Sequence, residues 1–169
     1  SKDLPIVDLR LVFDAGGARD MDADVLLPGL AKLTNGLIYE GSTGLSAQYI
    51  AETFEGMGVL YGNGSYRDMA VLDFRSLSDK NIFPKAMDLI NQILAEPVFE
   101  PKVLDRERNK MLVALKLAEE RPSSKASLAF YKTLYANKVK HPYASPTDGT
   151  KESLKKITRN DLIKYYKKY

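Results

Sequence analysis

The chain contains few side chains that could perform nucleophilic or metal chemistry. It has one histidine, His141, and no cysteine. This composition excludes disulfides, thiolate metal sites, cysteine nucleophiles and any site built on two histidines of this chain. His141 could act as a lone base, but no serine partner or orienting carboxylate can be assigned to it. We therefore interpret His141 as a packed or hydrogen-bonded loop residue.

Two pairs of carboxylates have the residue type that acid–base catalysis needs. Glu52 and Glu55 form one pair and Glu119 and Glu120 the other, and both pairs fall within predicted helices. Charged faces are ordinary on helices that border solvent. We therefore expect all four carboxylates to face water.

Two glycine-rich segments, at 56–58 and 62–64, suggest phosphate-binding loops. Such a loop lies between a strand and the N-terminus of a helix, where free backbone N–H groups meet the phosphate. Here both segments precede predicted strands. The sequence therefore predicts no nucleotide site.

Apolar periodicity predicts the elements that position these residues. A strand is predicted at Ile6–Phe13, which we interpret as central, and two more at 59–61 and 69–77, joined by a turn at 62–65. Helices are predicted at 25–37, 46–56, 79–96, 101–120, 123–135, 151–157 and from 161 onward, with Ser46, Ser123 and Thr158 as N-caps. This order predicts an α+β fold in which an antiparallel sheet packs against helices.

Length and composition fit one domain spanning residues 1–169. The chain is 44% hydrophobic and 28% charged, and it lacks the roughly 20 apolar residues that a membrane span needs. Residues 138–169 carry nine basic and three acidic side chains. We interpret these lysines as solvated helix faces and predict no nucleic-acid partner, because only Tyr165, Tyr166 and Tyr169 accompany them.

The segment Gly29–Leu37, followed by Tyr39 and 41–43, resembles the zinc helix of the insulinase/pitrilysin peptidases, which include mitochondrial processing peptidase. Four further pieces follow in family-like order: 5–20, the start of the 57–65 region, 97–109 and 141–162. The family helix reads Gly-x-Ala-His-x-x-Glu-His-Met. In that motif two histidines bind zinc from one helix face and the glutamate activates the zinc-bound water.

The resemblance places the zinc chemistry on residues that cannot perform it. The first histidine falls on Lys32, the catalytic glutamate on Asn35 and the second histidine on Gly36. The third ligand, a glutamate in the family, falls on Ala114, while Glu107 matches a supporting acidic position. A lysine repels a metal cation. The resemblance therefore implies an inactive homologue with no catalytic residues and no metal in this domain, although the active members bind zinc.

The resemblance implies a non-catalytic subunit or half of a zinc peptidase. Such a half shapes a chamber and binds polypeptide beside an active, zinc-bearing partner. The alternative is a structural scaffold subunit of the same fold with no peptidase role. Periplasm, cytoplasm and mitochondrial matrix all remain open as compartments. The sequence does not identify the substrate, organism or oligomeric state.

Family substrates add to the edge of the sheet, which makes one segment the candidate for backbone contacts by β-augmentation. Its residues are Gly62, Asn63, Gly64, Ser65, Tyr66 and Arg67. The alternative, that the two glycines only form a turn, stays open at this point. The resemblance also implies that residues 1–169 are the N-terminal domain of a longer two-domain chain.

Overall fold

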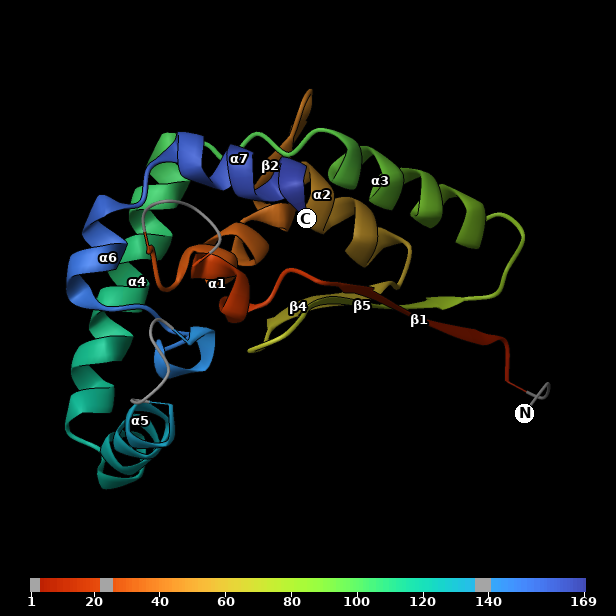
Figure 1. Ribbon diagram of the computed structural model, residues 1–169. Coiled ribbons are helices and arrows are strands. Elements are labelled where there is room, and N and C mark those ends of the chain that lie inside the picture. The colour runs from red at the N-terminus through yellow and green to blue at the C-terminus, as the bar shows by residue number, and fades with distance from the viewer. Residues whose placement is uncertain (1–3, 22–25, 136–140) are drawn as a thin grey trace.

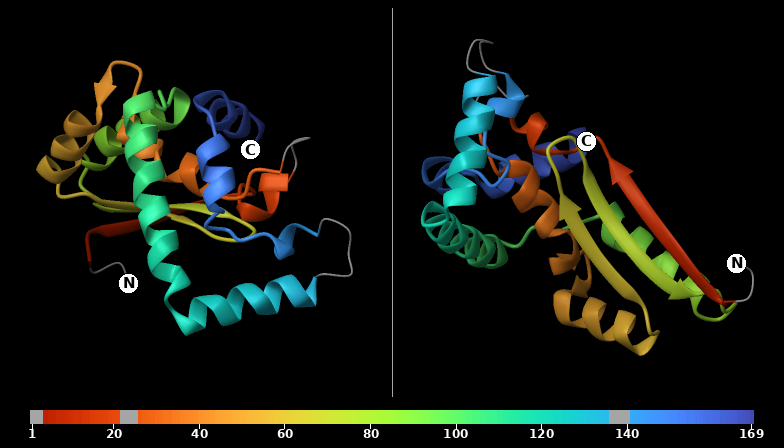
Figure 2. Two further views of the ribbon diagram at one scale, coloured as in Figure 1. Left: turned by 90° about the vertical axis from the view of Figure 1, so that its left-hand side faces the viewer. Right: turned by 90° about the horizontal axis from the view of Figure 1, so that it is seen from below.

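The computed structural model describes residues 4–21, 26–135 and 141–169. A sheet forms one layer, and helices cover one of its faces (Figure 1). The opposite face of the sheet carries no helix among the described residues (Figure 2). The predicted α+β class with an antiparallel sheet is therefore confirmed.

The main sheet has three antiparallel strands in the order β1-β5-β4. Their bounds are β1 Ile6–Phe13, β4 Leu60–Ser65 and β5 Ala70–Leu77. A separate two-stranded sheet pairs β2 (Gly41–Ser42) with β3 (Leu45–Ser46). Strand β1 has the predicted bounds, but the prediction of a central strand is wrong within the described residues, where β1 and β4 are the two edges.

The predicted turn at Gly62–Ser65 is also wrong, because these four residues belong to strand β4. Gly62 pairs with Asp73 and Gly64 with Val71. The chain reverses at 66–69 instead, where the Tyr66 N–H donates to the Met69 carbonyl at 2.8 Å. Glycines inside a strand leave the backbone bare on one face of the sheet.

Helices fill the other layer. Their bounds are α1 Leu30–Gly36, α2 Ala47–Gly56, α3 Phe83–Ala95, α4 Pro101–Glu119, α5 Pro122–Leu134, α6 Lys151–Lys156 and α7 Arg159–Lys168, with short 3-10 turns η1 Gly17–Met21, η2 Ile38–Glu40 and η3 Pro142–Ala144. Ser46 and Thr158 cap α2 and α7 as predicted. Ser123 caps no helix, because α5 starts one residue earlier, at Pro122.

Helix α1 starts later than the predicted 25–37 span. Gly29 lies in the left-handed region at φ 93°, which L side chains rarely adopt, and the helix begins at Leu30. The beginning of the predicted span, at Val25, lies outside the described residues. The helix keeps the predicted face, because Leu30, Leu33 and Leu37 are all buried.

Two clusters of buried residues form the core. One joins α1, α4, α6 and α7 through residues such as Leu33, Leu104, Leu154 and Leu162. The other joins α2, α3 and the sheet through residues such as Phe54, Leu72, Phe74 and Ile93. Burial of these side chains at about 25 cal/mol per Å² provides the main driving force for folding. The sheet and α1 are thereby fixed against each other.

Helix α5 contrasts with this core, because it contains no buried residue. It projects from the end of α4 beside η3 (Figure 2). Among the described residues, no helix has both the length and the apolar character required to cross a bilayer.

Candidate functional site

Helix α1 is held in place by a buried carboxylate. Asp20 is only 1% exposed and accepts hydrogen bonds from the backbone N–H groups of Gly29 and Ala31, both at 2.7 Å. These donors lie at the start of α1, where backbone N–H groups have no partner within the helix. Burial raises the pKa of Asp20 to about 7, against the lowering effect of the two N–H donors.

Asn35 connects α1 to the edge strand β4. Its side chain is buried, and its Nδ2 donates to the Gly64 carbonyl at 2.7 Å. In return, Nδ2 of Asn63 donates to the backbone carbonyl of Asn35, also at 2.7 Å. The buried Oδ1 of Asn35 accepts no hydrogen bond from the described residues. Asn35, which the resemblance led us to align with a catalytic glutamate, therefore holds β4 in place.

Lys32 and Gly36 lie on the exposed side of α1. The Lys32 ammonium forms an ion pair with Asp148, 116 residues further along the chain. A Cβ added to Gly36 would meet no atom within 4 Å. Neither position is needed for the packing of α1.

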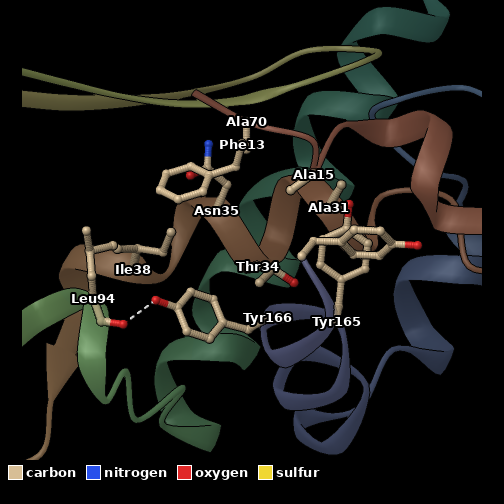
Figure 3. A pocket seen from close by; sticks show the side chains of 11 residues that line it. Phe13, Ala15, Ala31, Thr34, Asn35, Ile38, Ala70, Leu94, Tyr165 and Tyr166 are labelled. Atoms are coloured by element: carbon tan, nitrogen blue, oxygen red, sulfur yellow. Dashed lines mark hydrogen bonds between the residues drawn. The ribbon is translucent and has the colours of Figure 1, made fainter. Parts of the chain in front are cut away.

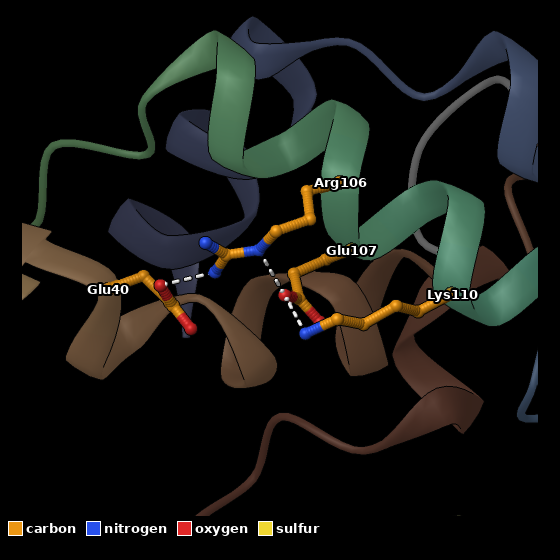
Figure 4. A network of polar contacts seen from close by, with 4 residues as sticks. All are labelled: Glu40, Arg106, Glu107 and Lys110. Carbon is orange, nitrogen blue, oxygen red and sulfur yellow. Dashed lines mark hydrogen bonds and ion pairs between the residues drawn. The ribbon is translucent and has the colours of Figure 1, made fainter.

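Helix α4 brings Glu107 to the same region. Arg106 Nε and Lys110 Nζ both donate to Oε1 of Glu107, at 2.9 and 2.7 Å, and Arg106 also donates to Glu40 at 2.6 Å (Figure 4). Burial raises the pKa of Glu107, but its ion pairs with Lys110 and Arg106 outweigh burial, so the pKa lies below its ordinary value. Oε2 of Glu107 accepts no hydrogen bond from a described residue.

These elements enclose a cavity of about 180 Å³. Its walls come from α1, β4 and α4, and the lining side chains include Lys32, Asn35, Asn63, Ser65 and Glu107. We name this space the α1–β4 pocket. It forms where the predicted zinc-helix positions 32, 35 and 36 meet the candidate substrate strand.

The α1–β4 pocket does not fit zinc. Lys32 and Asn35 offer an ammonium and an amide in place of imidazole and carboxylate, and Gly36 offers no side chain. Ala114 is exposed and does not line the pocket, which leaves Glu107 as its single carboxylate. Within the described ranges, no three His, Cys, Asp or Glu side chains come together as a metal site. A stable zinc site takes at least three such ligands.

A second cavity lies beyond α1, toward β1 and α7 (Figure 3). It measures about 160 Å³ and is lined mainly by apolar side chains such as Phe13 and Ile38. The hydroxyls of two of its tyrosines are already used, because Tyr165 donates to the Gly16 carbonyl and Tyr166 to that of Leu94. This cavity brings together no groups for acid–base or metal chemistry.

The six candidate substrate residues divide into two groups. Residues 62–65 belong to the edge strand β4, whereas Tyr66 and Arg67 lie in the turn that follows. The Arg67 guanidinium donates to the carbonyls of Tyr143 and Ser145 and lies 4.0 Å from the ring centre of Tyr131. The Arg67 side chain therefore links the 66–69 turn to α5 and to the η3 region.

His141 does not line the α1–β4 pocket and is a packed, hydrogen-bonded loop residue, as the sequence led us to expect. Its Nδ1 accepts from the Tyr143 N–H at 3.1 Å, and its ring stacks on that of Tyr135. The carboxylate pairs at 52 and 55 and at 119 and 120 are exposed. The predicted packed, hydrogen-bonded role of His141 and the predicted exposure of the four carboxylates are confirmed.

Sequence reasoning did not find several residues of the pocket. Met111 and Leu33 line it, and Asp148, Arg106 and Lys110 neutralise its charged groups. Met111 lies four residues after Glu107, which is one helical turn and was a usable signal. The partner of Lys32 is too distant in sequence for any local pattern to predict.

Comparison with known proteins gives one family. Residues 2–147 match the family model described as Insulinase (Peptidase family M16). The chain is 31% identical over 167 residues to the "Non-peptidase homolog YmxG" of Helicobacter pylori, covering 98% of this chain and 36% of that protein. It is 27% identical over 155 residues to the beta subunit of the mitochondrial-processing peptidase of Neurospora crassa, covering 91% of this chain and 31% of that protein.

A solved structure agrees with these relatives. The crystal structure of a peptidase M16 inactive domain from Pseudomonas fluorescens superposes with a TM-score of 0.89 and 39% identity, covering 96% of this chain and 38% of that one. The present chain thus spans about a third of the length of the relatives that it matches.

Proposed function

Since this chain belongs to the insulinase family of peptidases (family M16), we propose that it is a non-catalytic half of a zinc peptidase. In this proposal it binds polypeptide in extended form and closes a chamber together with an active, zinc-bearing partner. The observation that carries the proposal is the open strand edge at β4 beside a helix that carries Lys32, Asn35 and Gly36. The resemblance aligns these three residues with the zinc motif of active members.

The backbone of β4 supports the binding of an added strand. In an antiparallel pair, residues alternate between those bonded to the neighbouring strand and those that direct N–H and C=O away from it. The Tyr66 N–H donates to the Met69 carbonyl, so every second residue before Tyr66, namely Gly64 and Gly62, also hydrogen-bonds to β5. Tyr61, Asn63 and Ser65 consequently direct their backbone groups outward. An extended peptide can pair with these three residues.

The side chains on this strand support the same role. Asn63 and Ser65 face α1 and line the α1–β4 pocket. A peptide paired with β4 would therefore place every second side chain over the pocket. Gly62 and Gly64 carry no side chain on the opposite face of the strand, where the Tyr66 ring lies against Gly64.

The names of the relatives support the absence of catalysis. One relative is called a non-peptidase homolog, and one solved structure is called an inactive domain. The beta subunit of mitochondrial-processing peptidase is named as a subunit of a larger assembly. A partner with an intact His-x-x-Glu-His helix would supply the zinc-activated water that this chain cannot hold.

An affinity purification of the full-length native protein tests the partnership. Copurifying chains are identified by mass spectrometry and searched for an intact His-x-x-Glu-His helix. Such a chain at equal stoichiometry supports the proposed half-peptidase. A membrane assembly without any such chain would instead favour the alternative role as a structural scaffold.

A further inference from the structure

We propose that the α1–β4 pocket selects an uncharged side chain in the extended peptide that pairs with β4. This inference rests on the proposed function. It deepens that function by assigning the pocket left by the lost zinc chemistry to substrate selection, with Lys32 and Glu107 as the residues that set the preference.

The first step of the argument is the position of the pocket beside the strand edge. Asn63 and Ser65 contribute both the outward backbone groups of β4 and part of the pocket wall. A strand that hydrogen-bonds to them is about 4.8 Å away. One of its side chains therefore lies over the pocket, which has a volume of about 180 Å³.

The second step is the reason that the pocket is open. Gly36 lines it without a side chain, and a Cβ at this position meets nothing within 4 Å. The apolar wall comes from Leu33 and Met111. The Ser65 hydroxyl and the free Oε2 of Glu107 provide polar groups that no described residue occupies. The pocket thus suits a neutral side chain that combines an apolar stem with a hydrogen-bond donor, such as glutamine, because the charges of the lining disfavour a cationic donor.

The third step is the charge of the lining. One ammonium and one carboxylate line the pocket, and each already has an ion-pair partner: Asp148 for Lys32, and Lys110 with Arg106 for Glu107. A lysine or arginine in the guest peptide meets the Lys32 ammonium, and an aspartate or glutamate meets the Glu107 carboxylate. A charged side chain of the bound peptide would lose its hydration in the pocket and would find no unpaired opposite charge there.

Peptide binding measured by fluorescence anisotropy tests this inference with the full-length protein. Three labelled twelve-residue peptides share a background of Ser, Thr and Val and differ in a central pair of identical residues: Gln-Gln, Lys-Lys or Glu-Glu. Adjacent positions are changed together because one of the two faces the pocket in either orientation of the strand. We expect the Gln peptide to bind about threefold to tenfold more tightly than either charged peptide. This is the range of affinity changes that interactions between partly exposed charges produce.

Two variants at the pocket test which lining charge excludes which peptide. Lys32→Met removes the ammonium and raises affinity for the Lys peptide alone. Glu107→Gln removes the carboxylate and raises affinity for the Glu peptide alone. Glu40→Gln is the matched control, because Glu40 belongs to the same ion-pair network but does not line the pocket. We expect this control to leave the order of the three peptides unchanged.

The possible outcomes separate this inference from the proposed function. If none of the peptides binds to any variant, peptide binding itself is wrong and the inference fails with it. If the peptides bind with equal affinity, or if Lys32→Met and Glu107→Gln leave their order unchanged, the pocket does not select the side chain while peptide binding at β4 stands.

Discussion

Asn35 of helix α1 and Asn63 of strand β4 join the two elements, because the side-chain amide of each donates a hydrogen bond to a backbone carbonyl of the other element. The Asn63 amide donates to the Asn35 carbonyl, and the Asn35 amide donates to the carbonyl of Gly64, the residue after Asn63. Both bonds measure 2.7 Å. Asn35, which the family resemblance aligns with a catalytic glutamate, thus supports the strand on which we propose that peptides bind.

Introducing an acid at position 35 should damage the fold. In Asn35→Glu, a carboxylate replaces a donor in a site that is 3% exposed and lies against the Gly64 carbonyl. We expect a loss of about 2–4 kcal/mol in the free energy of unfolding, because an unpaired charge is buried. Asn35→Ala, which loses one hydrogen bond, should cost about 1–2 kcal/mol. Urea denaturation measures both, and an Asn35→Glu protein as stable as wild type would contradict the role of Asn35.

A proline in β4 should block peptide binding without breaking the sheet. Ser65 directs its N–H away from β5, so Ser65→Pro removes an outward donor and no bond of the existing ladder. We expect peptide affinity to fall by about tenfold, equivalent to one lost hydrogen bond at an ordered edge. Ser65→Ala keeps the N–H and is the matched control. Equal affinity of the two variants would exclude pairing at this residue.

The chain should hold no zinc. We expect well below one zinc per chain after purification without chelator, and no change of melting temperature when a chelator is added. Elemental analysis by mass spectrometry and a thermal melt provide the two readouts. About one tightly bound zinc per chain would falsify the interpretation of Lys32, Asn35 and Gly36.

Gly36 in the pocket and Gly16 beside the 66–69 turn should differ sharply in their tolerance of a side chain. Gly36→Ala should be neutral or stabilise by up to about 1 kcal/mol, because alanine is the better helix former and nothing lies near its Cβ. Gly16→Ala should destabilise by more than about 2 kcal/mol, because its Cβ would lie 2.3 Å from the Met69 nitrogen. Denaturant titration of the two variants side by side checks this contrast.

Asp20 should make stability depend on pH. Burial raises its pKa from 3.8 to about 7, so the folded state binds this proton more tightly than the unfolded chain. Its stabilising contribution is therefore complete below about pH 4 and is lost as the pH rises through about 7. In Asp20→Asn this slope should disappear. The stability difference between wild type and variant, measured from pH 4 to 8, should shift in favour of the variant at high pH. A shift in the opposite direction would show that the two N–H donors outweigh burial.

The sequence predicts the helices well where caps and apolar periodicity agree. The ends of α4 follow from Glu100-Pro101 and Arg121-Pro122, and the start of α7 follows from the capping box between Thr158 and Asp161. These signals are local, so the printed sequence contains them completely. The expectation that this domain holds no zinc likewise depends on residue types alone, and the metal analysis described above tests it.

The β4–β5 hairpin shows why other features could not be predicted. Gly62 and Gly64 favour a turn locally, yet the reversal lies at 66–69, where there is no glycine. The N–H groups of Gly17 and Ala18 donate to the carbonyls of Tyr66 and Arg67 and hold this turn from a distant segment. A tertiary contact thus overrides the local preference, and no short pattern reports it.

The exposed side of α1 has a consequence for the history of the chain. Asp20 and the buried leucines fix the helix, while Lys32 and Gly36 contribute nothing to its packing. Once selection for metal chemistry is relaxed, these two positions can drift among residue types without any loss of folding. Asn35 is constrained by its bond to Gly64. Among inactive descendants, we therefore expect folding to place no constraint on positions 32 and 36, so that only peptide selection by the α1–β4 pocket would conserve them. We expect position 35 to keep a hydrogen-bond donor.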